Sequence, residues 1–215
     1  MKQIPRFQVI TDEVLQTRYT HAQLARLAVE GGADAVQYRE KRPLTTRAIL
    51  AVAAEMRAAC GETLLIVDDR VDVACSVGAV AVHLGRDDLD VRTARAMLGA
   101  DAIIGGTANS YEEARTVWQS GVDYLGVGPI YGTTSKANPA PVMGLDVLAR
   151  ICADSPLPIV AIGSITAARI PEVLAAGAHG VAVLSEVLLA DDPAAAARRC
   201  RDAIDAHDAA REARQ

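Results

Sequence analysis

Leu64-Leu65-Ile66-Val67-Asp68-Asp69-Arg70 indicates the fold class, because an apolar run passes directly into charged residues. A strand that is buried on both faces has such a continuous apolar run. Other apolar runs in the chain also end in residue types that bind phosphate or metal: 35–36, 79–82, 103–104, 124–127, 159–162 and 181–184. A (β/α)8 barrel builds its active site from polar residues at the carboxyl ends of its strands. The pattern therefore predicts a fold and a site together.

Segments with strand and helix patterns alternate along the whole chain. We expect strands near residues 6–10, 35–39, 63–67, 79–83, 102–105, 123–127, 158–162 and 180–184. Helical patterns fall between and after them, at 21–30, 45–59, 70–77, 90–98, 110–119, 144–153, 167–176 and about 192–210. Short connections between β and α elements favour a parallel sheet with right-handed crossovers, and the number of strands favours a closed barrel over an open doubly wound sheet. We therefore predict an α/β fold, a single TIM-barrel domain over residues 1–215, with a frayed tail from about residue 206.

Local signals support this segmentation. Thr20 and Ser110 precede helical patterns, and their side-chain oxygens are suited to accept hydrogen bonds from free N–H groups of the first helical turn. A similar small-residue turn stands before three of the expected strands, at 31–34, 120–123 and 176–179. This similarity predicts a weak internal repeat of one βα unit.

The composition limits the classes of function. The chain is 51% hydrophobic and 3% aromatic, and its net charge of −5 gives no basic surface for nucleic acid. The start of the sequence lacks the apolar core of a signal peptide, and no stretch approaches the ~20 apolar residues that span a bilayer. The cysteines show no zinc spacing, so we expect buried thiols. We predict a cytoplasmic protein without nucleic-acid or membrane partners, and leave a homo-oligomer open.

The segment from Gly128 to Lys136 is the strongest local signal for a phosphate site. Its glycines permit a tight backbone, and Thr133, Thr134 and Ser135 offer hydroxyl donors beside the charge of Lys136. Gly163-Ser164 and Leu184-Ser185 follow the last two expected strands, where barrels often hold phosphate on backbone N–H groups. An ordinary polar loop is the competing interpretation for each signal alone. Together they indicate a phosphate monoester site.

A second, ionic cluster points to a diphosphate and a metal ion. Arg39 and Lys41 lie two residues apart, so an extended segment directs both the same way. Asp69 and Asp88 end strands that we expect to be neighbours, and Mg2+ would neutralise two such carboxylates while also binding phosphate oxygens. Solvated surface charges and a helix cap remain the alternatives. His83 ends an apolar strand and is interpreted as a hydrogen-bonded structural residue.

At these residues the chain resembles the thiamine phosphate synthase family, from about residue 7 to residue 200. Segment 37–41, Gln-Tyr-Arg-Glu-Lys, is similar to the family's Gln-x-Arg-x-Lys, which holds the pyrimidine and its diphosphate. Asp68-Asp69 stands at the family's Asn-Asp, and segment 83–88 at its His-(aliphatic)-Gly-Gln-x-Asp. The resemblance implies that Asp69 and Asp88 bind Mg2+ and that Gln37, Arg39, Lys41, Asp68, Thr107 and Lys136 bind the pyrimidine diphosphate.

The resemblance extends to the monophosphate signals. Segment 133–136 looks like the family's Thr-x-Thr-Lys, and Gly163-Ser164 and Leu184-Ser185 stand at its Gly-Gly and aliphatic-Ser pairs. These matches imply that the thiazole phosphate is bound by Thr133, Thr134, Ser135, Gly163, Ser164, Leu184 and Ser185. They also imply a transferase that joins a pyrimidinylmethyl diphosphate to a thiazole phosphate, with Mg2+, Arg39, Lys41 and Lys136 stabilising the leaving diphosphate.

This chain departs from the family pattern at Asp68, Arg86 and Ser164, where the family has Asn, Gln and Gly. Thr107 replaces a Ser and keeps the hydroxyl. A related group isomerises the thiazole phosphate with a His at the position of Asn109, so thiazole phosphate isomerisation is one alternative. A paralogue that binds thiamine phosphates without catalysis is a second, and a generic sugar-phosphate barrel is a third.

Overall fold

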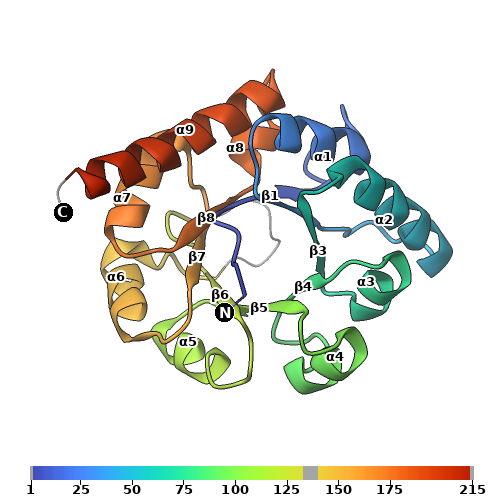
Figure 1. The fold of residues 1–215 in the computed structure, drawn as a ribbon, viewed down its shortest axis with the longest axis horizontal. Coiled ribbons are helices and arrows are strands. Elements are labelled where there is room, and N and C mark those ends of the chain that lie inside the picture. Colours follow the sequence, from blue (N-terminus) through green and yellow to red (C-terminus); the bar gives the residue numbers. More distant parts are fainter. Residues whose placement is uncertain (1, 133–139, 214–215) are drawn as a thin grey trace.

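The computed structural model describes residues 2–132 and 140–213, and its strands form a closed parallel barrel in sequence order (Figure 1). The strands are β1 (Phe7–Thr11), β2 (Ala35–Tyr38), β3 (Leu64–Asp68), β4 (Ala81–Leu84), β5 (Ile103–Ala108), β6 (Tyr124–Val127), β7 (Ile159–Ile162) and β8 (Gly180–Val183). The pairing of β8 with β1 closes the barrel, with Phe7 opposite Val181. The predicted (β/α)8 TIM barrel is confirmed.

The helices form an outer ring around the strands (Figure 1). They are α1 (His21–Glu30), α2 (Thr46–Cys60), α3 (Val71–Val77), α4 (Val91–Leu98), α5 (Tyr111–Val117), α6 (Gly144–Asp154), α7 (Ile170–Ala175) after a 3-10 turn (Ala167–Arg169), α8 (Ser185–Leu188) and α9 (Pro193–Glu212). The sequence analysis did not predict the short helix α8. It also placed a frayed tail from about residue 206, whereas α9 continues to Glu212.

The predicted local signals have the expected geometry. Thr20 accepts a hydrogen bond from the backbone N–H of Gln23 in a capping box, and Ser110 accepts one from Glu113. The glycine of each repeated turn adopts a left-handed conformation, with φ of 88°, 92° and 99° at Gly32, Gly121 and Gly177. A side chain is strained at such angles, so glycine suits the step from a helix to the next strand.

Side chains alternate between two cores along each strand. On β2, Val36 and Tyr38 pack in the large core between strands and helices, while Ala35 and Gln37 take the intervening positions toward the barrel axis. The interior positions are apolar near the middle of the barrel, as at Ile66 and Ala81. They become polar toward the carboxyl ends of the strands. The fold therefore directs polar side chains to one end of the barrel.

Two expectations from composition can be compared with the structure. The described cysteines are free; Cys60 and Cys200 are buried and Cys152 is half-buried, but Cys75 is exposed, so the prediction of buried thiols is wrong there. Within residues 2–132 and 140–213, no helix combines the length and apolar character needed to cross a membrane.

Candidate active site

A cavity of about 560 Å³ opens at the carboxyl ends of the strands. Every described residue that the sequence analysis assigned to the site lines it: Gln37, Arg39, Lys41, Asp68, Asp69, Asp88, Thr107, Gly163, Ser164, Leu184 and Ser185. The assigned residues Thr133, Thr134, Ser135 and Lys136 lie outside the described residues. The barrel thus brings the expected diphosphate and monophosphate segments, which are far apart in sequence, around one cavity.

Lys41, which follows β2, faces the neighbouring carboxylates of Asp68 and Asp69 at the end of β3. The Nζ atom of Lys41 forms an ion pair with Asp69 and lies 3.5 Å from Oδ2 of Asp68. Gln37 donates a hydrogen bond of 2.7 Å from Nε2 to Oδ1 of Asp68. Asp68, which stands where the resembling family has Asn, therefore accepts a hydrogen bond from an amide and shares one cation with Asp69.

The carboxyl groups of this cluster have unequal proton affinities. Burial, together with the adjacent charge of Asp69, raises the pKa of Asp68 to about 7. Burial opposes ionisation of Asp69, but its hydrogen bond and charge interaction with Lys41 outweigh burial and lower its pKa. Burial and the charge of Asp69 raise the pKa of Asp88, despite a hydrogen bond from Gly85. The side chains in the cluster therefore do not fully neutralise its negative charge.

Backbone geometry directs the two predicted metal ligands. Asp69 has a φ of 62°, a left-handed conformation that Asp tolerates better than most residues, and its N–H donates to the carbonyl of His83 at 2.9 Å. Asp88 accepts a hydrogen bond of 2.6 Å from the N–H of Gly85. A tight turn at the end of each of β3 and β4 thus directs a carboxylate toward the cavity.

Asp12 does not line the cavity but holds a residue that does, and the sequence analysis missed it. It is 2% exposed, accepts hydrogen bonds from the N–H groups of Val14 and Leu15, and forms an ion pair with Arg39. Because a buried and hydrogen-bonded carboxylate has little freedom, Asp12 fixes the direction of the Arg39 guanidinium. The signal in the sequence was weak, because Asp12 follows Thr11 in a segment that also contains Gln8, whereas Asp68 directly follows an apolar run.

His83, on β4, lies in the barrel interior and contacts Thr107, one of the residues predicted to bind the diphosphate. Its Nδ1 atom is 3.0 Å from the hydroxyl of Tyr124, and its Nε2 atom is 2.9 Å from Oγ1 of Thr107. The interpretation of His83 as a hydrogen-bonded residue is confirmed. Tyr124 was not singled out in the sequence, because it begins an apolar run. In the structure its side chain is 1% exposed.

The opposite wall of the cavity is formed by tightly packed backbone after β6 and β7. A Cβ atom at Gly128 would lie 2.1 Å from the carbonyl oxygen of Ile162, and one at Gly163 would lie 2.6 Å from the Cα of Pro129. Ser164 keeps a left-handed turn with a φ of 48°, although it stands where the resembling family has glycine. The left-handed turn is therefore formed without glycine, at a cost of about 1–2 kcal/mol for the non-glycine residue.

Two further residues named in the sequence analysis are committed to other contacts. Asn109 donates from Nδ2 to the carbonyl of Gly128, and its own N–H donates to Glu113 at 2.8 Å. Arg86 is exposed and forms an ion pair with Glu113. Arg86 therefore pairs with Glu113 and not with Asp68. The charge of Asp68 is partly offset by its ion pair with Lys41.

The described residues alone do not form a complete metal site. Among the described residues, no group of three or more His, Cys, Asp or Glu side chains could hold a metal ion. Asp69 and Asp88 would supply two hard oxygen ligands with incompletely neutralised charge. Mg2+ commonly binds through one or two carboxylates together with water and substrate phosphates, so this donor set fits it.

The chain is similar to known proteins over nearly its whole length. A family model described as thiamine monophosphate synthase matches residues 7–187. A thiamine-phosphate synthase of Salinibacter ruber is 47% identical over 95% of this chain and 90% of its own length. One from Methanocella arvoryzae is 44% identical over 91% of this chain and 93% of its own. The solved thiamine phosphate pyrophosphorylase of Pyrococcus furiosus superposes with a TM-score of 0.84 at 36% identity, covering 94% of this chain and 96% of that one.

Proposed function

The chain belongs to the thiamine monophosphate synthase family, and we propose which reaction the residues at the carboxyl ends of its strands catalyse. In this reaction the enzyme joins 4-amino-2-methyl-5-pyrimidinylmethyl diphosphate to 4-methyl-5-(2-phosphoethyl)thiazole, or to its carboxylated form, and yields thiamine phosphate and diphosphate. One observation carries this proposal. A single cavity places cations and paired carboxylates on one side, and backbone turns suited to a phosphate monoester on the other.

The diphosphate half of the site comprises residues from β2 to β5. Arg39, which Asp12 holds in place, offers a fork of N–H donors, and Lys41 offers a point charge on the same side. Thr107 adds a hydroxyl at the end of β5. These groups would stabilise the negative charge that develops on the departing diphosphate, which is where preorganised donors contribute most to rate.

Asp69 and Asp88 would hold Mg2+ against the same diphosphate. The ion, when bound, supplies positive charge that a leaving diphosphate needs and that the described side chains provide only in part. Lys41 now pairs with Asp69, so its ammonium would be released toward the diphosphate when the carboxylate acquires another partner. We infer that Lys41 and the metal act on the diphosphate together.

The monophosphate half of the site would fix the nucleophile. The turns at Gly163-Ser164 and Leu184-Ser185 adjoin the cavity, and by resemblance the segment 133–136 contributes hydroxyls and Lys136. Between the halves, the cavity wall includes the apolar residues Ile10, Val160 and Ile162. An apolar floor favours stacked heteroaromatic rings and strengthens the interactions of the charged rim.

The protein's main contribution is then positioning. An aminopyrimidine is electron-rich enough to stabilise a methylene cation, so diphosphate can depart before the thiazole nitrogen attacks. Holding the two molecules in reacting geometry removes much of the entropic barrier to a bimolecular step. No covalent nucleophile is required from the protein.

Isomerisation of the thiazole phosphate is the second candidate function. It would need a base at the position of Asn109, but an amide that donates to the Gly128 carbonyl is unsuited to remove a proton. The contacts of Arg39, Lys41, Asp69 and Asp88 would also have no role in that reaction. The structure therefore favours the synthase.

An assay with both substrates, with and without Mg2+, tests the proposal. We expect thiamine phosphate and diphosphate in equal amounts, and neither product when Mg2+ or one substrate is omitted. Conversion of the thiazole isomer alone would instead support an isomerase. Tight binding of thiamine phosphate without turnover would support a non-catalytic paralogue.

The leaving-group assignment has its own test. Lys41→Met and Lys136→Ala should each lower turnover by about 10²–10³-fold at saturating substrates and Mg2+. Arg47→Met is the matched loss of a cation, because Arg47 is exposed on the outer helix α2. Unchanged turnover in either lysine variant would contradict the assignment of that lysine.

A further inference from the structure

Two hydrogen bonds connect β4, β5 and β6 beneath the diphosphate half of the site. The ring of His83 lies between the hydroxyl of Tyr124, 3.0 Å from Nδ1, and the hydroxyl of Thr107, 2.9 Å from Nε2. Thr107, His83 and Tyr124 all line the cavity, and of these Tyr124 is almost fully buried. The imidazole thus couples a buried phenol to a hydroxyl that faces the substrate space.

Two glycines create the space that this arrangement needs. A Cβ atom at Gly105 would lie 2.5 Å from Nδ1 of His83 and 2.3 Å from the ring of Tyr124. One at Gly126 would lie 2.7 Å from Cε1 of His83. The ring is therefore held against the glycine backbone of β5 and β6, and its orientation is fixed by shape as well as by hydrogen bonds.

The environment of Tyr124 sets the direction of these hydrogen bonds. Burial, together with the nearby charge of Asp68, raises the pKa of Tyr124, so its hydroxyl keeps its proton and can donate. The phenol is almost fully buried, so the hydrogen of its hydroxyl needs an acceptor within the protein. We assign Nδ1 of His83, 3.0 Å away, as that acceptor.

The neutral imidazole then has one arrangement of its proton. When Nδ1 accepts from Tyr124, Nε2 carries the hydrogen and donates to the oxygen of Thr107. The hydrogen of the Thr107 hydroxyl is consequently available to the cavity. In the other tautomer, Nε2 would accept that hydrogen, and Thr107 would present only lone pairs to an anion.

We propose that Tyr124 and His83 are positioning residues that make Thr107 a hydrogen-bond donor to the leaving diphosphate. This inference rests on the proposed function, because it specifies how one of the diphosphate contacts is prepared. Neither positioning residue needs to touch the diphosphate. Their effect should therefore pass through the hydroxyl of Thr107.

A double-mutant cycle on the binding of inorganic diphosphate tests this route. In the presence of Mg2+, we expect calorimetry to show Kd raised about tenfold in Thr107→Val and about fivefold in Tyr124→Phe. In the double variant, Kd should equal that of Thr107→Val alone, since Tyr124 then has no hydroxyl to direct. Additive effects, or an unchanged Kd in Tyr124→Phe, would overturn the inference.

Control variants separate positioning from general damage to the fold. Tyr111→Phe removes a phenol that bonds Asp154 outside the barrel, and Kd should stay at the wild-type value. His83→Gln retains an N–H donor for Thr107, whereas His83→Leu does not, so the first should bind diphosphate more tightly than the second. Equal weakening in the two His83 variants would show that His83 only fills space.

A ligand-free measurement distinguishes failure of this inference from failure of the proposed function. Nitrogen chemical shifts of the imidazole should show His83 protonated at Nε2 in the wild type, with the Nδ1–H tautomer gaining population in Tyr124→Phe. Protonation at Nδ1 in the wild type would refute the inference whatever the protein catalyses. A wild type that has the expected tautomer but binds no diphosphate with Mg2+ would contradict the proposed function.

Discussion

At the amino end of the barrel the protein's own groups neutralise Asp123, whereas at the carboxyl end they neutralise the cluster of Asp68, Asp69 and Asp88 only in part. At the amino end, Asp123 receives Lys2, Arg95 and the N–H of Ile104 at 2.8–3.0 Å. Burial opposes its ionisation, but the hydrogen bond from Arg95 and the others outweigh burial and lower its pKa. At the carboxyl end, the pKa values of Asp68 and Asp88 are raised.

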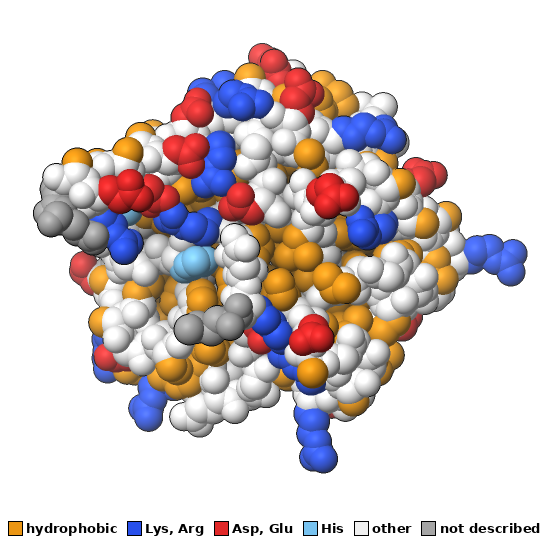
Figure 2. Space-filling view, viewed as in Figure 1, with side chains coloured by type: hydrophobic (Ala, Val, Ile, Leu, Met, Phe, Trp, Pro, Cys, Tyr) orange, Lys and Arg blue, Asp and Glu red, His pale blue; other side chains and the backbone are white. Residues whose placement is uncertain are grey.

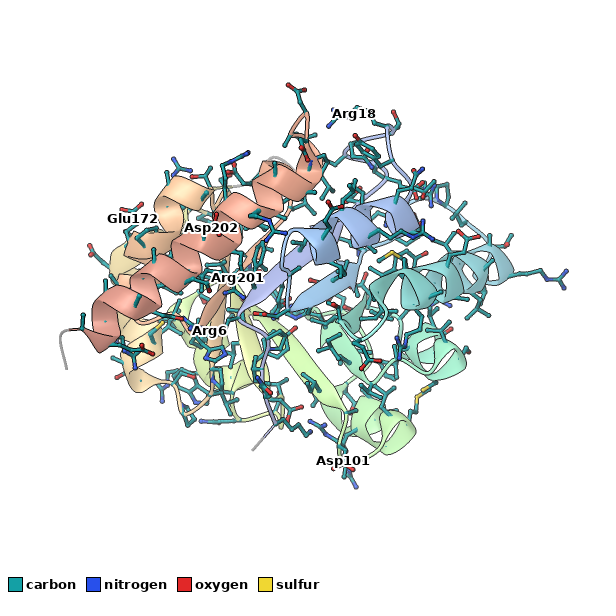
Figure 3. The ribbon with its side chains drawn as sticks, turned by 45° about the horizontal axis from the view of Figure 1, so that its top comes forward. Arg6, Arg18, Asp101, Glu172, Arg201 and Asp202 are labelled. Atoms are coloured by element: carbon teal, nitrogen blue, oxygen red, sulfur yellow. The ribbon has the colours of Figure 1, made fainter. Side chains whose placement is uncertain are left out.

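Other charged residues at the amino end also form ion pairs within the protein. Figure 3 labels Arg6, which directly precedes β1, and Arg201, which is on α9. Arg6 pairs with Asp208, and Arg201 pairs with Asp34 at 3.0 Å. The face in Figure 2 accordingly shows blue and red side chains beside one another. These paired charges contribute to the fold, whereas the incompletely neutralised carboxylates at the other end can still bind ligands.

Asp88→Asn should produce the largest effect, and it should lower turnover without lowering the free energy of unfolding. Its amide oxygen can still accept the hydrogen bond from Gly85, but the second of the two proposed anionic metal ligands is lost. We expect turnover at fixed low Mg2+ to fall about 10²–10³-fold, and the free energy of unfolding without Mg2+ to stay equal or rise because Asp69 loses a like charge. Steady-state assays and urea unfolding measure the two. Unchanged Mg2+ dependence would remove Asp88 from the site.

Asp123→Asn should have the opposite signature. It leaves Lys2 and Arg95 without their shared carboxylate, so we expect the free energy of unfolding to fall by about 2 kcal/mol. Turnover should stay within about twofold of the wild type, because Asp123 lies at the far end of the barrel. Urea unfolding provides the measurement. A loss of activity larger than the loss of folded protein would contradict the separation of the two ends.

The sequence was sufficient for the barrel because each signal was local. The apolar runs, the caps at Thr20 and Ser110 and the glycine turns each specify a short segment, and alternation of segments specifies the rest. Helix α8 was missed because four residues carry too little periodicity. The partners of Asp12 and Tyr124 were missed for a different reason. Those contacts join strands that are distant in sequence, such as the 41-residue separation of His83 and Tyr124.

The pH dependence of stability should differ between the wild type and a variant that lacks the Asp68 carboxyl group. Asp68 has a folded pKa of about 7 against an unfolded value near 3.9, so the folded protein binds the extra proton in this window. Stability without Mg2+ should therefore fall as pH rises from about 4 to about 7. Asp68→Asn should remove roughly 1–3 kcal/mol of this fall, measured by urea unfolding at several pH values. Parallel pH profiles for variant and wild type would refute the raised pKa.

Ser164→Gly should have the smallest effect. Glycine relieves the left-handed strain at a φ of 48° but adds freedom to the unfolded chain. We expect a net gain in the free energy of unfolding of about 0.5 kcal/mol. Thermal and urea unfolding should agree on the sign, and a clear loss of stability would show that the Ser164 side chain makes a contribution larger than the strain.

Ligand-induced stabilisation tests most directly the claim that one end of the barrel is completed by its ligands. The unfolding midpoint should be measured for the wild type, Asp69→Asn and Asp123→Asn, with and without Mg2+ plus inorganic diphosphate. We predict a rise in the wild type and an equal rise in Asp123→Asn, but little or none in Asp69→Asn, whose Asn also tolerates the left-handed turn. An equal rise in Asp69→Asn, or none in the wild type, would contradict the account.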